Sequence, residues 1–381
     1  MVDPPVAIAK QWVTGRDFPV DRPLLDVSQA VPSYPPAPEL REHIAALALE
    51  PATSTYAPAT GLPAARAAVA AHMSGAYHAE IGVDDVQITG GCNQAFCLVM
   101  QALTEPGDEV ILPVPFYFNH DMWLRAIGVE PVYVRLDPSS GLVLDPSEVA
   151  PLVSPRTRAI VLVTPNNPSG AEYPPEALAA CFEMARDTGI ALVLDETYKD
   201  FRGPDGLAHD LFDRPAWHDT LVQLFSFSKV FSLAGYRAGS IVAHPALLRE
   251  TVKLLDCMTI GAPRIAQEAV VFGLAELSEW VAERRYEMRE RVVTFRDALT
   301  MGAPAWRIVS AGAYFAYLEH PFEGRTSIEV ARNLAAEQNL LVIPGELFGP
   351  GQEHAVRLAF GNLDAEQVPE VVARLAATVT A

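Results

Sequence analysis

The sequence predicts an α/β fold, in which a large domain has a mainly parallel, doubly wound sheet and a smaller domain is α+β. Two observations support the large domain. Between residues 86 and 241, short apolar runs alternate with segments of helical periodicity. The apolar runs are rich in Val, Ile and Leu without two-residue alternation, which is typical of parallel strands covered by helices on both faces. A third observation indicates the smaller domain, because strands and helices no longer alternate strictly after Pro263.

Each expected strand of the large domain is short and apolar, and a loop that is polar or rich in glycine follows most of them. The strands comprise residues 86–89, 109–113, 130–136, 158–165, 190–196 and 221–228. Between them, residues 94–108 and 174–189 show helical periodicity and end at Pro or Gly stop signals. This part of the chain is therefore predicted to alternate between strand and helix.

The smaller domain is expected to combine a long helix over about 277–299 with strands over 307–312, 313–320 and 355–360. The first forty-five residues carry eight prolines. We expect them to be mostly extended and to pack on the C-terminal lobe or on a neighbouring subunit. The predicted boundaries are 1–45 for an N-terminal arm that joins the small domain, 46–276 for the large domain and 277–381 for the C-terminal small domain.

The composition argues against several classes of function. Half of the 381 residues are hydrophobic, and the formal net charge is −19 without a basic run of five or more. This charge argues against nucleic acid or an anionic membrane surface as a partner. The sequence contains no cationic start followed by a long apolar segment, so we expect a cytoplasmic protein. The four cysteines form no CxxC pair, so neither a metal site nor a disulfide framework is expected.

The loops after the expected strands carry the candidate functional residues, because ligands of an open α/β sheet bind beyond the carboxyl ends of its strands. The loop GGCNQAF at 90–96 places two glycines where a strand turns into a helix. Free backbone N–H groups at such a turn can bind a phosphate, and Arg237 and Ser226 add a cation and a hydroxyl. Glycine at this kind of turn is also common for purely structural reasons.

Four further side chains could hold an aromatic, carbonyl-bearing cofactor. Asp195 ends an apolar run, and burying its carboxylate requires a positive partner such as a protonated ring nitrogen. Asn167 and Tyr198 could hydrogen-bond a phenolic oxygen, and Tyr117 could stack on an aromatic ring. The alternatives are a helix cap or a local ion pair for Asp195, turn formation for Asn167, and core packing for the tyrosines.

Lys229 is the candidate reactive residue. It is one of only four lysines, the others being Lys10, Lys199 and Lys253, and it lies among small and apolar residues in SFSKVFSLAGYR. An amine that is flanked by apolar residues and lies near another cation has a lowered pKa, which a nucleophile that forms a Schiff base requires. The alternative is a solvated surface lysine.

Seven motifs together resemble a known family. They are YAPATGLPAAR at 56–66, TGGCNQA at 89–95, PVPFYFNH at 113–120, TPNNPSG at 164–170, DETY at 195–198, SFSKVFSLAGYR at 226–237 and VRLAFGN at 356–362. Their order and spacing are similar to those of the fold type I enzymes that use pyridoxal 5′-phosphate (PLP), and within them to the class I/II aminotransferases. The resemblance implies PLP as the cofactor and exchange of an amino group between an L-amino acid and a 2-oxo acid.

The resemblance also implies roles for the matching residues. Lys229 would form the Schiff base and move the proton between Cα and C4′, and Asp195 would keep the pyridine nitrogen protonated. Tyr198 would bind the 3′ oxygen of the ring together with Asn167, and Lys229, Asp195 and Tyr198 form the predicted catalytic set. Arg357 would bind the substrate α-carboxylate, with Asn167 and Ala30 or Val31 also near the substrate.

The remaining cofactor contacts follow from the same resemblance. Tyr117 would stack on the ring, and His120 would support Asp195. The phosphate would be bound by Gly91, Cys92, Asn93, Ser226, Ser228 and Arg237. Tyr56 resembles the tyrosine that reaches the cofactor of the neighbouring subunit, so a homodimer with shared active sites is expected.

Three alternatives to an aminotransferase are compatible with these residues. A PLP-dependent C–S lyase, or another elimination or decarboxylation enzyme, would use the same cofactor site. Ser226 and Lys229 also fit the S-x-x-K motif of penicillin-recognising acyl enzymes, although the companion motifs S-D-N and K-T-G are absent. A PLP-binding sensor would carry a DNA-binding domain, and no basic N-terminal module is present. For the substrate side chain, Phe116, Phe118 and Tyr34 are compatible with an apolar or aromatic group.

Overall fold

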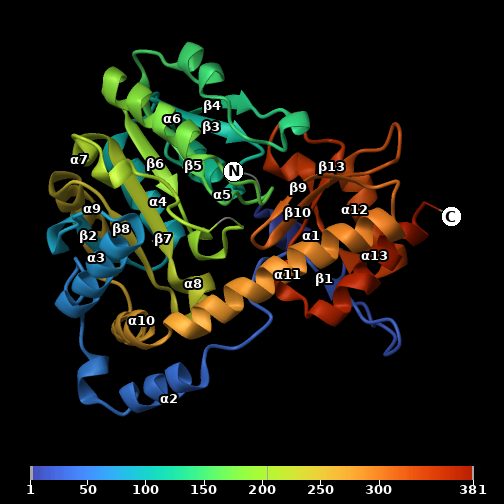
Figure 1. Cartoon of the computed structure of the whole chain (residues 1–381), viewed down its shortest axis with the longest axis horizontal. Helices are drawn as coiled ribbons and strands as arrows, with labels where there is room; N and C mark the ends of the chain where they lie inside the picture. The colour runs from blue at the N-terminus through green and yellow to red at the C-terminus, as the bar shows by residue number, and fades with distance from the viewer. Residues whose placement is uncertain (1–2, 204, 380–381) are drawn as a thin grey trace.

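The computed structural model describes residues 3–203 and 205–379, and it contains a large sheet of seven strands in the order β2-β8-β7-β6-β5-β3-β4 (Figure 1). Its strands are β2 (Val86–Thr89), β3 (Glu109–Val114), β4 (Glu130–Arg135), β5 (Thr157–Val163), β6 (Ala191–Asp195), β7 (Leu221–Ser226) and β8 (Gly239–Val242). The five strands from β4 to β7 run parallel, whereas β8 is antiparallel to both β7 and β2. The predicted mainly parallel α/β sheet is therefore confirmed.

Helices cover both faces of this sheet. One face packs against α3 (Pro63–Tyr77), α6 (Pro175–Thr188), α7 (Trp217–Thr220) and α10 (Arg264–Glu276), and the other against α4 (Cys92–Leu103), α5 (Phe118–Ala126) and α9 (Pro245–Thr259). Successive strand residues alternate between the two cores, as Ile111 faces the first and Leu112 the second. Pro63, Pro175 and Pro245 each stand at a helix start, where the missing N–H costs no helical hydrogen bond.

Three features of the large sheet differ from the sequence prediction. Strand β8 was not expected, because its four residues form too short an apolar run to give a signal. Strand β4 was expected to be buried on both faces, but it lies at the sheet edge and is largely exposed or half-buried. The strand expected over 221–228 ends at Ser226, because the Ser226 side chain accepts a hydrogen bond from Ser228 N and caps the short helix α8 (Phe227–Val230).

The smaller, antiparallel sheet has the order β12-β13-β10-β9. Its strands are β9 (Arg307–Gly312), β10 (Phe315–Glu319), β12 (Ile343–Pro344) and β13 (Ala355–Leu358), and its helices are α11 (Ser278–Gly302), α12 (Ser327–Gln338) and α13 (Val368–Ala377). The long helix α11 joins the two parts of the molecule (Figure 1). Arg357 on β13 pairs with Tyr317 on one side and Ile343 on the other, so this arginine lies on an inner strand and is buried.

The N-terminal segment is more regular than predicted. It contains α1 (Pro5–Gln11), β1 (Leu25–Asp26) and α2 (Pro38–Leu47), so the expectation of an extended backbone is wrong for the two helices. Two of the prolines that suggested extension, Pro5 and Pro38, stand at the first turns of α1 and α2, where proline is tolerated. Strand β1 pairs in parallel with β11 (Leu340–Leu341), which confirms that this segment packs on the C-terminal lobe. The boundaries 1–45, 46–276 and 277–381 stay a prediction.

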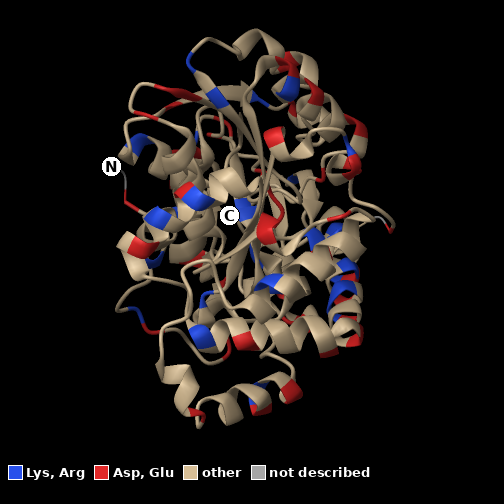
Figure 2. Ribbon diagram, turned by 90° about the vertical axis from the view of Figure 1, so that its left-hand side faces the viewer, with Lys and Arg blue, Asp and Glu red and all other residues tan. Residues whose placement is uncertain are grey.

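Charged residues are distributed over many elements. Figure 2 shows Lys and Arg interspersed with Asp and Glu rather than gathered in one stretch. No helix within residues 3–203 and 205–379 is long and apolar enough to cross a membrane.

Candidate active site

A cavity of about 390 Å³ opens at the carboxyl ends of β5, β6 and β7, beside the N-terminus of α4. It brings together most of the predicted site residues. Those that line it are Ala30, Cys92, Asn93, Tyr117, Asn167, Asp195, Tyr198, Ser226, Ser228, Lys229, Arg237 and Arg357. Because these residues come from strands, helices and loops spread over some 330 positions of the chain, the fold itself assembles the site.

Lys229 lies on α8, where the turn after β7 directs its amine into the cavity. Its Nζ donates a hydrogen bond to the carbonyl oxygen of Ala30. Burial lowers the pKa of Lys229 to about 8, and the nearby cations Arg237 and Arg357 act in the same direction. A fraction of the amine is therefore neutral and nucleophilic near neutral pH.

Asp195 is the last residue of β6 and is buried at the base of the cavity. Its Oδ1 accepts a hydrogen bond from the Thr197 N–H at 3.0 Å, and His120 Nε2 lies 3.5 Å from its Oδ2. Burial opposes ionisation, but His120 and Thr197 outweigh it, so the pKa of Asp195 lies below its ordinary value. The cavity therefore contains a fixed negative charge.

Another part of the cavity offers positive groups. Gly91 caps α4 with a φ of 96°, and a Cβ at this position would collide with Arg237 Nη2, so only glycine fits. Arg237 is held by the Gly90 and Ala234 carbonyls at 3.0 and 2.8 Å, and its Nη1 lies 3.4 Å from Ser228 Oγ. The first N–H groups of α4 and this guanidinium can bind one anion between them.

Arg357 lies at the side of the cavity that faces the C-terminal lobe. It is 2% exposed, donates to Asn167 Oδ1 at 3.0 Å and to the Ser28 carbonyl, and lies over Phe348 at 5.0 Å. Burial lowers its pKa to about 10, which leaves the guanidinium charged at neutral pH. Its Nε has no hydrogen-bond partner among the described residues. The arginine is therefore poised to receive a further acceptor such as a carboxylate.

The two cavity tyrosines remain protonated. Burial raises the pKa of Tyr117 to about 12 and raises that of Tyr198 well above its ordinary value. Tyr117 OH accepts a hydrogen bond from Asn119 Nδ2 at 2.8 Å, and Tyr198 is held by the rings of Tyr314 and Phe315. Both phenols can therefore donate hydrogen bonds within the cavity.

Three predicted site residues do not line this cavity. Gly91 and His120 lie behind it, and His120 stacks on Phe96 with the ring centroids 3.9 Å apart. Tyr56 is 79% exposed and lies outside the cavity of its own chain. Conversely, the sequence prediction missed Thr197, which follows the predicted DETY aspartate by two positions, and it missed the wall residues Pro4, Val6, Gln29 and Asn119.

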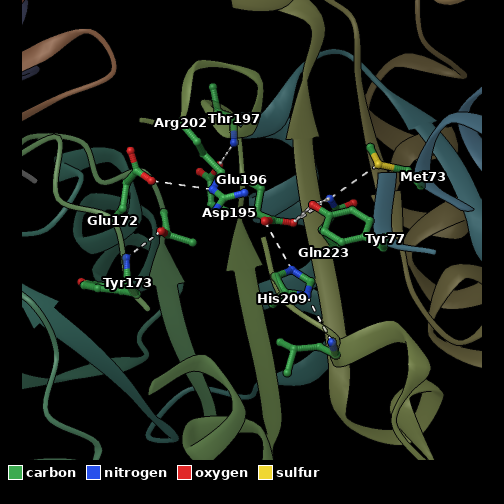
Figure 3. A network of polar contacts seen from close by, with 12 residues as sticks. Met73, Tyr77, Glu172, Tyr173, Asp195, Glu196, Thr197, Arg202, His209 and Gln223 are labelled. Atoms are coloured by element: carbon green, nitrogen blue, oxygen red, sulfur yellow. Dashed lines mark hydrogen bonds and ion pairs between the residues drawn. The ribbon is translucent and has the colours of Figure 1, made fainter. Parts of the chain in front are cut away.

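Glu196, the residue after Asp195, faces away from the cavity into a buried network (Figure 3). Its Oε2 accepts hydrogen bonds from Tyr77 OH and, at 2.9 Å, from Gln223 Nε2, while His209 Nε2 lies 3.3 Å from Oε1. Burial opposes ionisation of Glu196, but His209, Tyr77 and Gln223 lower its pKa overall. Because successive residues of a strand point to opposite faces, two buried carboxylates serve separate environments here.

Comparison with known proteins identifies the class. The sequence matches the family described as aminotransferase class I and II over residues 22–375. The chain therefore belongs to the class I and II aminotransferases, which are PLP-dependent enzymes of fold type I. The predicted family, fold, cofactor and reaction class are confirmed, and the C–S lyase, acyl-enzyme and sensor alternatives find no support.

Individual relatives are similar over most of their length. The chain is 30% identical over 358 residues to the aromatic aminotransferase ISS1 of Arabidopsis thaliana, covering 92% of this chain and 88% of that protein. It is also 30% identical over 322 residues to the arginine–pyruvate transaminase AruH of Pseudomonas aeruginosa, covering 84% and 81%. The solved aspartate aminotransferase from Thermus thermophilus with maleate superposes with a TM-score of 0.90 at 25% identity, covering 99% of this chain and 97% of that one.

The cavity fits PLP. The amine of Lys229 matches its aldehyde, and the ionised Asp195 matches a protonated ring nitrogen. Gly91, Arg237 and the start of α4 form a cradle for its phosphate, and a side chain at position 91 would fill that cradle. The phenol of Tyr198 and the amide of Asn167 lie on the same cavity wall and can donate to the ring oxygen.

The lowered pKa of Lys229 leads to a pH-dependent prediction. We expect the rate at which the apoprotein captures PLP to rise with pH and to level off above an apparent pKa of about 8. The sign follows because only the neutral amine attacks an aldehyde, and this form predominates above the pKa. Stopped-flow absorbance between about pH 6 and pH 10 measures the profile. A midpoint near the ordinary lysine value of 10.5 would contradict the burial argument.

Proposed function

We propose that this chain moves an amino group from an L-amino acid to a 2-oxo acid, with Lys229, Asp195 and Arg357 as its working residues. The observation that carries the proposal is that these three side chains line one cavity with the charges the reaction needs. Lys229 provides the amine, Asp195 a negative charge and Arg357 a positive charge.

Arg357 binds and orients the substrate. Its guanidinium can grip the α-carboxylate with two parallel hydrogen bonds, replacing its contact with the Ser28 carbonyl and using the unpartnered Nε. Phe315 and Phe348 lie about the guanidinium at 5.4 and 5.0 Å and keep it from rotating. A bound substrate then has its Cα directed toward the interior of the cavity that Lys229 faces.

Lys229 and Asp195 move or hold protons in this proposal. PLP, when bound, supplies the aldehyde that takes up the amino group and the ring that accepts the electron pair released at Cα. Lys229 Nζ takes the proton from the substrate Cα, and a pKa of about 8 suits such a transfer near neutral pH. Asp195 holds a proton on the ring nitrogen, while Tyr198 and Asn167 donate to the ring oxygen.

Nitrogen transfer tests the proposal directly. The holoenzyme is incubated with ¹⁵N-labelled amino acids and unlabelled 2-oxo acids, and mass spectrometry follows the label. We expect one amino acid to lose its label and one oxo acid to become a labelled amino acid in equal amount. Release of labelled ammonia without an acceptor would instead indicate an elimination reaction.

Substitution of Arg357 by lysine tests the carboxylate site. We expect Arg357→Lys to raise the KM of the amino donor by about a hundredfold, because an ammonium cannot form the paired hydrogen bonds of a guanidinium. Steady-state kinetics measures the change. Arg307→Lys, at an exposed arginine on β9, is the matched control and should retain the original KM. An unchanged KM in Arg357→Lys would contradict the assigned role.

A homodimer with shared sites is the proposed active form. Tyr56, Met258 and Ile260 are large exposed side chains, and Thr55 is tied to the start of α10 by a 3.3 Å hydrogen bond from Arg264. This cluster offers an apolar surface to a second copy, from which Tyr56 would reach the phosphate in that copy's cavity. Tyr56 is not among the described residues that line the cavity of its own chain, which supports this proposal.

Tyr56→Phe tests the shared site. We expect the variant to stay dimeric by light scattering while its affinity for PLP falls by about tenfold, because one hydrogen bond to the phosphate is lost. Equilibrium titration of the apoprotein with PLP measures the affinity. Tyr286→Phe, at a similarly exposed tyrosine of α11, is the control. A monomeric wild type, or equal affinities in both variants, would contradict the shared site.

A reducing compartment, the cytoplasm, remains the proposed location of the protein, which the four unpaired cysteines support.

A further inference from the structure

Among the described residues that line the cavity, three side chains are cationic, and each already has a proposed role. Of the described residues that line it, Lys229, Arg237 and Arg357 carry positive side chains. Lys229 is the reactive amine, Arg237 adjoins the phosphate cradle at Gly91, and Arg357 faces the substrate α-carboxylate. Within this chain, none of these three cations remains for a second substrate carboxylate.

One part of the wall is uncharged. It contains Pro4, Val6, Val31 and Phe118, together with the amides of Gln29 and Asn119. Phe118 is buried against Phe348, so its ring is a fixed part of this wall. Apolar groups and amides offer nothing that balances a carboxylate removed from water.

The charges next to this wall are negative. An adjoining cavity of about 230 Å³ shares Phe118 and is lined by the carboxylates of Asp3, Asp121 and Glu346. Asp121 is paired with Arg125, and Glu346 accepts hydrogen bonds from Ser327. Both side chains already have partners, and none of the described residues that line this adjoining cavity supplies a cation for a substrate carboxylate on the other side of the ring.

We propose that this enzyme acts on amino acids and 2-oxo acids that have a single carboxylate and an uncharged side chain, and that it discriminates against dicarboxylic substrates. The inference rests on the proposed function and adds the substrate class.

The sequence suggested Phe116, Phe118 and Tyr34 as side chains near the substrate. Of these three, Phe118 lines the cavity whereas Phe116 and Tyr34 do not. Phe116 stacks on Tyr133, and the Tyr34 hydroxyl lies 3.1 Å from that of Tyr314.

Lys10 is a further cation that contacts this wall. It is exposed, and its Nζ donates to Gln29 Oε1 at 3.2 Å from the solvent side. This contact occupies the amide oxygen of Gln29 and leaves its NH₂ group as a donor for a neutral polar substrate. In water, a cation at the rim contributes little to carboxylate binding.

A pair of isosteric ligands tests the inference on the holoenzyme. Succinate and isocaproate have the same shape, except that two methyl groups replace the two oxygens of one carboxylate. Calorimetric titration should show that isocaproate binds at least about tenfold more tightly than succinate. The aspartate aminotransferase from Thermus thermophilus, solved with maleate, is the control that should show the opposite preference. Succinate binding as tight as isocaproate binding would overturn the inference, whichever residue supplied the charge.

A charge added to the wall provides a second measurement. Val31→Lys should increase the affinity for succinate by about tenfold, since it supplies the missing cation at the half-buried wall. Val20→Lys, at a residue that is 98% exposed and outside the cavity, adds the same charge and should leave succinate affinity unchanged. Equal affinities in the two variants would show that Val31 does not face the second carboxylate and would overturn the inference.

Measurement of the reaction distinguishes a failure of the proposed substrate class from a failure of the proposed function. Leucine and aspartate are isosteric in the same way, and leucine should donate nitrogen at least about tenfold faster. If aspartate is the better donor, the substrate class is wrong while the proposed function stands. If no amino acid transfers its nitrogen, the proposed function fails. The relative affinities for succinate and isocaproate would still show whether the cavity wall disfavours a second carboxylate.

Discussion

Replacing Lys229 with alanine is expected to abolish covalent retention of PLP and to lower turnover by at least about a thousandfold. The variant loses both the amine that captures the aldehyde and the base that takes the proton from Cα. Stability should change by no more than about 1 kcal/mol, because the amine hydrogen-bonds only to the Ala30 carbonyl and faces the cavity. Borohydride reduction followed by peptide mass spectrometry locates the captured PLP, and initial rates measure turnover.

Lys253→Ala provides the matched control for this experiment. Lys253 is exposed on α9 and is paired only with Glu250, so its loss should leave PLP retention and turnover unchanged. PLP that remains attached to Lys229→Ala after reduction, or activity close to that of the wild type, would refute Lys229 as the reactive residue.

The second large effect is expected for Asp195→Asn, which should lower kcat by about a hundredfold to a thousandfold. An amide has no charge with which to hold a proton on the ring nitrogen, so the developing negative charge at Cα is poorly stabilised. PLP should still bind, because Lys229 and the phosphate cradle at Gly91 are intact. Steady-state kinetics and PLP titration separate the two effects.

Glu196→Gln is the informative comparison, because it removes the neighbouring buried carboxylate. Glu196 lies outside the cavity and is held by Tyr77, Gln223 and His209 (Figure 3). We expect its free energy of unfolding to fall by about 2–4 kcal/mol while kcat of the folded enzyme stays within about threefold of the wild type. Denaturant unfolding and kinetics measure both. A loss of activity in Glu196→Gln as large as in Asp195→Asn would contradict the separation of the two roles.

Much of the architecture could be read from local patterns. The six strands predicted in the large domain exist, and α11 spans Ser278–Gly302 close to the predicted helix, because burial on both faces of a sheet and helical periodicity leave strong local signals. Strand β8 and the edge position of β4 escaped prediction, since both depend on which strands become neighbours. Helices α1 and α2 were missed because proline at a first helical turn resembles proline in an extended segment.

The candidate site also has features that the sequence predicted and features that it did not. The sequence by itself predicted Lys229, Asp195 and Arg357 as the residues of the chemistry, since each lies in a motif whose residue types the reaction requires, and their roles stay a prediction. Only the tertiary structure decided what surrounds them. It placed Val6 and Gln29 from the N-terminal segment in the cavity that Lys229 also lines, directed Glu196 into a separate buried network and left Tyr56 outside the cavity. The physical reason is that motifs act through backbone geometry over a few residues, whereas walls and charge environments arise from contacts between segments far apart in the chain.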